Sequence, residues 1–188
     1  MAPESRDMDP TILLHRFRYH FGRGFITPSD RVLDLGCGIG YGVAMLSEVA
    51  KYVIGYDIDI ANINTCNAQS KKDNNEFIMA NLEDVKLKEA EVATSFEVIE
   101  HLYKPAKFIK KLKKKIKKFI IVSVPIGQTL IEVDGDMQVG DDPTHHSVFP
   151  FKEDLNDLFL DDDWGLFYGF QTGIIYMAAY YNRNQYED

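Results

Sequence analysis

The segment Arg31-Val-Leu-Asp-Leu-Gly-Cys-Gly-Ile-Gly-Tyr-Gly42 constrains the fold of this chain more than any other stretch. Residues 31–35 form a short apolar run rich in branched side chains, which is typical of a strand buried on both faces. The glycines at 36, 38 and 40 lack a Cβ, so the backbone there can adopt positive φ and lie close to a ligand. The pattern predicts a buried strand, a ligand-binding glycine turn and then a helix.

Two acids indicate which ligand the turn binds. A dinucleotide fingerprint would place its third glycine at position 41, where this chain has Tyr41, and Asp34 lies in the strand just before the turn. A carboxylate there repels pyrophosphate and favours a cationic, amino-acid-like part of a ligand. Asp57 follows a second predicted strand, about 20 residues downstream, where an acid can accept hydrogen bonds from both ribose hydroxyls.

Together, Val32–Gly40 and Val53–Asp57 resemble the cofactor signature of class I S-adenosylmethionine-dependent methyltransferases, and the resemblance extends over nearly the whole chain. It implies S-adenosyl-L-methionine as the cofactor. The alternative is a doubly wound domain that binds another nucleoside ligand, since one fold hosts many functions. Carried over residue by residue, the resemblance implies a cofactor site of Tyr19, Asp34, Gly36, Cys37, Gly38, Asp57, Ile58, Asn81, Leu82 and Glu97.

Strand and helix patterns alternate along the chain, as a parallel sheet with crossover helices requires. We predict an α/β fold: a Rossmann-like, doubly wound sheet of seven strands, mostly parallel with an antiparallel edge strand, plus an N-terminal helix. Residues 1–188 are expected to form a single domain, with a helical cap over 1–26 and a core over 27–182. The expected helices are 9–25, 41–50, 60–72, 105–117 and 151–160, and the expected strands are 31–35, 52–56, 76–79, 92–96, 119–124, 164–170 and 174–181.

The N-terminal helix carries Arg18 and Tyr19, which resemble an Arg-Tyr pair found ahead of the glycine turn in many relatives, particularly in cell-surface sugar biosynthesis. There the tyrosine or arginine closes over the methionine carboxylate. A surface amphipathic helix is the alternative. Asn81 replaces the acid that family members present to the adenine amino group. Its amide oxygen can still accept, and the backbone at Leu82 can serve the adenine ring.

The segment Glu97-Val-Ile-Glu100-His101-Leu follows the fourth predicted strand, on the side where open parallel sheets bind ligands. A helical turn starting at Glu97 would place Glu97, Glu100 and His101 on one face. The motif resembles one found in many small-molecule methyltransferases. It also resembles the small-RNA 3′-terminal 2′-O-methyltransferases, in which the glutamates and histidines bind a divalent ion.

Residues 126–149 are polar, without helical or strand periodicity, and are expected to form a long functional loop. Its His145-His146 pair resembles the histidine that relatives place over the transferable methyl. Imidazoles suit general base catalysis near neutral pH, and the candidates are His146, His145 and His101, in that order. Glu100 would orient an imidazole or hold the acceptor. A histidine pair without a role, and a Glu-His motif that only caps and packs its helix, are the alternatives.

A metal-assisted reaction is a further alternative. Glu97, Glu100, His101 and His146 would then bind Mg²⁺, Mn²⁺ or Fe²⁺, and the ion would lower the pKa of an acceptor hydroxyl.

The formal net charge of −8 disfavours general binding to nucleic acid, which depends on Lys and Arg. Lysines nevertheless crowd residues 104–118, so a phosphate-bearing substrate is an alternative to a merely solvated face. Two cysteines make no disulfide framework, and the chain begins without a secretory pattern. No apolar run approaches the roughly 20 residues of a membrane span. We therefore expect a soluble, cytoplasmic protein.

Three functions remain. The first is an enzyme that methylates a hydroxyl or amine of a small metabolite or sugar. The second is a metal-dependent methyltransferase of an RNA 3′ end, which the charge disfavours, and the third is a non-catalytic S-adenosylmethionine-binding module. The sequence leaves the acceptor and the oligomeric state open.

Overall fold

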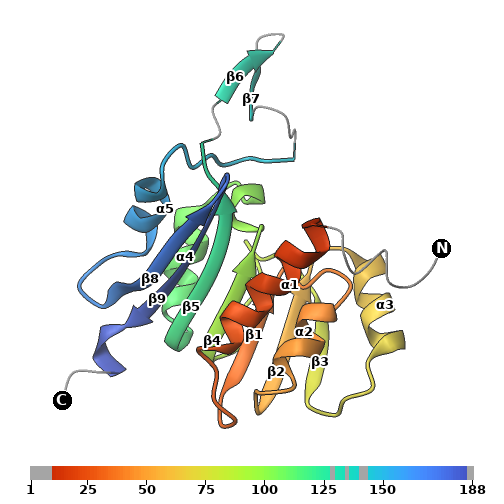
Figure 1. The fold of residues 1–188 in the computed structure, drawn as a ribbon. Coiled ribbons are helices and arrows are strands. Elements are labelled where there is room, and N and C mark those ends of the chain that lie inside the picture. The colour runs from red at the N-terminus through yellow and green to blue at the C-terminus, as the bar shows by residue number, and fades with distance from the viewer. Residues whose placement is uncertain (1–9, 128–129, 134–135, 140–143, 186–188) are drawn as a thin grey trace.

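The computed structural model describes residues 10–127, 130–133, 136–139 and 144–185. Its central feature is a seven-stranded sheet with the strand order β3-β2-β1-β4-β5-β9-β8 (Figure 1). The predicted Rossmann-like, mostly parallel sheet is confirmed. Its strands are β1 (Arg31–Leu35), β2 (Tyr52–Asp57), β3 (Asn75–Met79), β4 (Ala90–Phe96), β5 (Ile116–Pro125), β8 (Trp164–Thr172) and β9 (Ile175–Asn182).

Strands β1 to β5 run parallel, so their carboxyl ends meet at one edge of the sheet. β9 pairs antiparallel with β5, where Val122 lies opposite Ala178, and also antiparallel with β8. The antiparallel hairpin predicted at the sheet edge is therefore confirmed, with β8 outermost.

Helices cover both faces of the sheet (Figure 1). On one face, Tyr19, Val43 and Ile63 from three helices pack against strand residues such as Val32. On the opposite face, Phe108 and other helix residues pack against the alternate strand positions. The helices are α1 (Pro10–Arg23), α2 (Tyr41–Leu46), α3 (Ile60–Gln69), α4 (Pro105–Lys113) and α5 (Lys152–Phe159), with short 3₁₀ turns η2 (Ile99–His101) and η3 (Arg183–Gln185).

The extent of the lysine-rich helix was predicted wrongly. α4 ends at Lys113 instead of Lys117, and β5 already begins at Ile116, whose side chain is buried and which pairs with Ala90. The lysines after the helix lie in the turn before β5 and in β5 itself, where Nζ of Lys118 donates to Oδ1 of Asp30 over 2.6 Å. Ile116 follows Leu112 by four residues and so continues the apolar stripe of the helix, which is why these residues were assigned to one helix.

The N-terminal helix occupies Pro10–Arg23, slightly less than the predicted 9–25, and residue 9 lies outside the described residues.

The prediction of a structureless segment over 126–149 was also wrong. Strands β6 (Leu130–Val133) and β7 (Asp136–Val139) form a separate antiparallel two-stranded sheet, which stands away from the main sheet beyond the end of β5 (Figure 1). The sequence between them contains Asp134-Gly135, a pair that favours tight hairpins. That local signal was overlooked because the surrounding composition is polar.

Within the described part of the chain, no helix combines the length and apolar character that crossing a membrane requires.

Candidate cofactor and acceptor site

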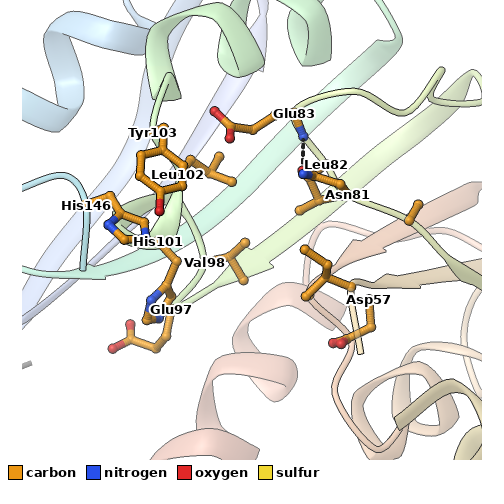
Figure 2. A pocket seen from close by; sticks show the side chains of 13 residues that line it. Asp57, Asn81, Leu82, Glu83, Glu97, Val98, His101, Leu102, Tyr103 and His146 are labelled. Atoms are coloured by element: carbon orange, nitrogen blue, oxygen red, sulfur yellow. Dashed lines mark hydrogen bonds between the residues drawn. The ribbon is translucent and has the colours of Figure 1, made fainter. Parts of the chain in front are cut away.

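A pocket of about 380 Å³ opens where β1, β2, β3 and β4 end (Figure 2). Asp57 and Asn81 lie on one side of it, and Glu97 and His146 lie on the other. Residues that are distant in sequence therefore converge at the carboxyl edge of the sheet. Of the predicted site residues, the pocket is lined by Gly36, Asp57, Ile58, Asn81, Leu82, Glu97, His101 and His146.

The glycine turn has the backbone that its sequence predicts. Gly36, Gly38 and Gly40 have φ values of 77°, 53° and 84°, in the left-handed region that favours glycine. The Gly36 amide donates to the Tyr56 carbonyl over 2.8 Å, which fixes the turn against β2. A Cβ on Gly36 would lie 2.3 Å from Cγ2 of Val98, whereas one on Gly38 would meet nothing within 4 Å. The two positions therefore need glycine for different reasons.

Asp57 lines the pocket and is hydrogen-bonded to the glycine turn. One carboxylate oxygen accepts from the Gly38 amide over 2.8 Å, and the other accepts from the Asp59 amide over 2.9 Å. The second oxygen, Oδ1, also accepts from Nδ2 of Asn62 over 3.3 Å, whereas Oδ2 keeps further acceptor capacity, since an ionised carboxylate offers about four lone-pair positions. Asp57 thus holds the glycine turn in place and can still accept from a ribose hydroxyl.

The expected adenine segment forms a tight turn at the pocket wall. Oδ1 of Asn81 accepts from the Glu83 amide over 2.9 Å (Figure 2). The Asn81 carbonyl accepts from the amides of Asp84 and Val85, at 3.1 and 2.9 Å. Asn81 therefore organises this turn with both its side chain and its backbone, and one side-chain lone pair is left for a ligand.

Glu97 departs from the predicted geometry. Its φ is 56°, in the left-handed region, and the 3₁₀ turn begins only at Ile99, so Glu97, Glu100 and His101 do not share one helical face. The predicted helical turn was wrong because tertiary contacts fix Glu97: Oε1 accepts from the Ser123 hydroxyl over 2.7 Å and lies 3.4 Å from Nη2 of Arg18. A strained backbone persists where its surroundings over-determine it. Glu97 is thereby held at the pocket.

Tyr19 and Asp34 form a buried pair beneath the turn instead of lining the pocket. The Tyr19 hydroxyl donates to Oδ2 of Asp34 over 3.1 Å, and the Thr94 hydroxyl donates to Oδ1 over 2.7 Å. Burial raises the pKa of Asp34 to about 6, against the opposing effect of these two hydrogen bonds. Cys37 is likewise buried, and burial raises the pKa of its thiol.

The raised pKa of Asp34 predicts a pH-dependent stability. Below about pH 4 the Asp34 carboxyl is protonated in both the folded and the unfolded state. Between about pH 4 and 6 it ionises in the unfolded state but stays protonated in the folded state, and above about pH 6 it is ionised in both. Its contribution to the free energy of unfolding therefore falls with rising pH, by about 3 kcal/mol for a shift of about two units.

Urea unfolding of the wild type and of Asp34→Asn between pH 4.5 and 7.5 measures this effect. The difference in unfolding free energy between them should change in favour of Asp34→Asn as the pH rises. Tyr19→Phe removes one donor and should move the midpoint to higher pH. A difference that is constant with pH would contradict the assignment.

The two adjacent histidines diverge. The amides of His146 and Ser147 donate to the Glu100 carbonyl, at 2.8 and 2.9 Å, which fixes this segment against η2. The His146 ring then stacks on Tyr103 with centroids 3.8 Å apart, at the pocket wall. The His145 ring instead packs edge-on against His101.

Among the described residues, Glu100, His101 and His145 each offer a metal-ligating atom, and these atoms lie within 4.8 Å of one another. This group contains His145 in place of Glu97 and His146, the other members of the predicted metal set. Carboxylate and imidazole ligands together suit Mn²⁺ or Fe²⁺.

Some pocket residues were not predicted. Glu83, Val98 and Tyr103 line the pocket; Val98 lies within the Glu-His motif but was not singled out, and Tyr103 had only its place beside that motif as a signal. Ser123 was missed because a strand serine looks like any other small buried residue. The remaining predicted residues, Tyr19, Asp34, Cys37, Gly38, Glu100 and His145, lie around the pocket without lining it.

The Rossmann-like sheet gathers these groups at one edge, and comparison with known proteins specifies the class of protein further. Residues 33–119 match a family described as a methyltransferase domain. A probable S-adenosylmethionine-dependent methyltransferase of Mycolicibacterium smegmatis is 36% identical over 80 residues. That match covers 42% of this chain and 30% of the relative, so the matched segment spans less than a third of the curated protein's length.

Solved structures share the fold over a larger part of the chain. A putative S-adenosylmethionine-dependent methyltransferase from Listeria monocytogenes has a TM-score of 0.70 at 12% identity, covering 89% of this chain and 99% of its own. The N-methyltransferase NodS from Bradyrhizobium japonicum, in complex with S-adenosyl-L-homocysteine, has a TM-score of 0.68 at 12% identity, covering 96% and 91%. Residues 33–119 thus match a methyltransferase-domain family, and the sheet shares the fold of these solved structures.

Proposed function

We propose that this chain transfers a methyl group from S-adenosyl-L-methionine to a hydroxyl or amine of a small metabolite or sugar. One observation carries the proposal: a single pocket brings together the glycine turn, Asp57, Asn81 and Glu97, which come from the ends of four different strands. That set offers acceptors for ribose hydroxyls and for an adenine amino group, with a carboxylate facing the cationic part of the ligand. We also propose that residues 1–188 form a single domain in the cytoplasm, where free thiols such as Cys37 and Cys66 persist.

The residues present fit this cofactor. The side chain of Val98, a pocket residue, lies close to where a Cβ on Gly36 would be, so a larger residue at position 36 would displace it. Asp57 would hold the ribose, Ile58 would pack on the adenine, and Asn81 with the Leu82 backbone would recognise its edge. Arg18 is buried beside Glu97, and its Nε has no hydrogen-bond partner among the described residues; it would support the methionine end. When bound, the cofactor supplies a methyl group on a sulfonium sulfur.

The chain itself would position the methyl donor and the acceptor and remove one proton from the acceptor. Holding two reactants in register can lower a barrier by about 7–11 kcal/mol. His146 lines the pocket, and its ring is held by stacking on Tyr103. It is the first candidate for the general base, followed by His145 and His101. Glu100 is buried close to His101 and His145, and it would orient an imidazole or hold the acceptor.

A metal-assisted methyltransferase is the second candidate, favoured by the Glu100, His101 and His145 group. A bound divalent cation would lower the pKa of an acceptor hydroxyl near these residues.

Thermal unfolding with S-adenosylmethionine and S-adenosylhomocysteine, each with Mn²⁺ or with EDTA, tests both candidates. We expect both ligands to raise the melting temperature in EDTA, because a ligand that binds only the folded state stabilises it. A shift that requires Mn²⁺ and disappears in His145→Ala would favour the metal-assisted candidate. Absence of any shift by either ligand would contradict the proposal.

A further inference from the structure

The turn that carries the expected adenine contacts depends on one side chain from the opposite side of the pocket wall. Lys111 lies on α4, and its Nζ donates to three backbone carbonyls: Leu82 at 2.6 Å, Glu83 at 3.1 Å and Val85 at 3.0 Å. An ammonium group has three N–H donors, so these contacts use all of them. Two of the three residues, Leu82 and Glu83, line the pocket.

These bonds add to the hydrogen bonding within the turn. The amides of Glu83, Asp84 and Val85 already donate to Asn81, through its side chain and its carbonyl. The carbonyls of such a turn lack partners inside it, as at the end of any helical turn. Lys111 supplies donors to three of these carbonyls, so the turn is held from inside by Asn81 and from outside by Lys111.

The position of Lys111 is itself well determined. Its neighbours Phe108, Ile109 and Leu112 are buried in the core, which fixes α4 against the sheet. The ammonium also lies 5.7 Å from the centroid of the Phe108 ring. A fixed helix thus presents a fixed charge to the turn.

We propose that Lys111 is a positioning residue for recognition of the base of the nucleoside ligand. It holds the Asn81–Val85 turn so that the Asn81 side chain and the Leu82 backbone face the pocket. This inference rests on the proposed function, since it concerns the adenine end of the same site. Lys111 acts through the turn and does not itself contact the ligand.

The test compares Lys111→Met, which keeps the length of the side chain and removes its donors, with Lys110→Met, an exposed neighbour on the same helix. Calorimetry measures binding of S-adenosylhomocysteine and of S-inosylhomocysteine, in which the adenine amino group is replaced by oxygen. We expect Lys111→Met to bind S-adenosylhomocysteine at least tenfold more weakly and to lose most of the discrimination between the two ligands. Lys110→Met should stay within twofold of wild type in both respects.

Amide hydrogen exchange in the ligand-free proteins gives a second readout. Exchange of residues 82–85 should accelerate at least tenfold in Lys111→Met, while β1 and β4 remain as protected as in wild type. Equal weakening of both ligands, or unchanged exchange in the turn, would overturn the positioning role. Wild type that fails to bind S-adenosylhomocysteine would overturn the proposed function and this role with it, whereas wild type that binds beside an unaffected Lys111→Met overturns this inference alone.

Discussion

Asp57→Ala is expected to weaken binding of S-adenosylhomocysteine by at least about 10- to 100-fold. Each hydrogen bond to a charged acceptor contributes about 1.5–3 kcal/mol, and the substitution removes the carboxylate proposed to hold the ribose. It also leaves the amides of Gly38 and Asp59 without the acceptors they have now, at 2.8 and 2.9 Å. The glycine turn would therefore lose an anchor in addition to the ligand contact. Calorimetry on purified variants measures the change.

Asp59→Asn is the matched control, two residues away at the start of α3. Oδ1 of Asp59 accepts from the Ala61 amide over 2.7 Å as a helix cap, and asparagine caps equally well. This variant should bind S-adenosylhomocysteine within twofold of wild type. Equal affinity of Asp57→Ala and wild type would mean that the ribose lies elsewhere.

The sequence was most informative where local chemistry alone decides the structure. β1 begins and ends at the predicted residues, because an apolar branched run is bounded by Arg31 and by Gly36, whose φ is positive. The seven-stranded sheet followed from the same alternation of strand and helix patterns. Glycine and β-branched residues are local signals, so they can be read without knowing what surrounds them.

Prediction failed where distant contacts decide. Nothing near Glu97 in sequence indicates its left-handed backbone, since Arg18 and Ser123, which hold it, come from α1 and β5. The adjacent rings of His145 and His146 are placed by different partners, His101 and Tyr103, which the sequence does not reveal. The burial of Tyr19 likewise depends on a distant partner, Asp34 in β1, to which its hydroxyl donates. In each case the side chain's partner, and not its own type, determines what it can do.

Gly36→Ala is expected to lower the free energy of unfolding of the ligand-free protein by about 2–5 kcal/mol. A left-handed backbone costs an alanine about 1–2 kcal/mol, and overpacking a dense site costs about 1–3 kcal/mol more. The second contribution arises because the new Cβ would lie 2.3 Å from Cγ2 of Val98. Urea unfolding measures the total.

Gly38→Ala separates the two contributions. Its φ of 53° imposes a similar backbone cost, but its Cβ would meet nothing within 4 Å, so it should be less destabilising than Gly36→Ala by about 1–3 kcal/mol. Val98→Ala should then rescue part of the loss in the Gly36→Ala background and none of it in the Gly38→Ala background, which is a coupling that neighbours show and distant sites do not. Equal losses in both single variants, without coupling to Val98, would mean that only the backbone conformation demands glycine at position 36. In that case the close approach of the turn to the Glu-His segment would have no part in shaping the pocket.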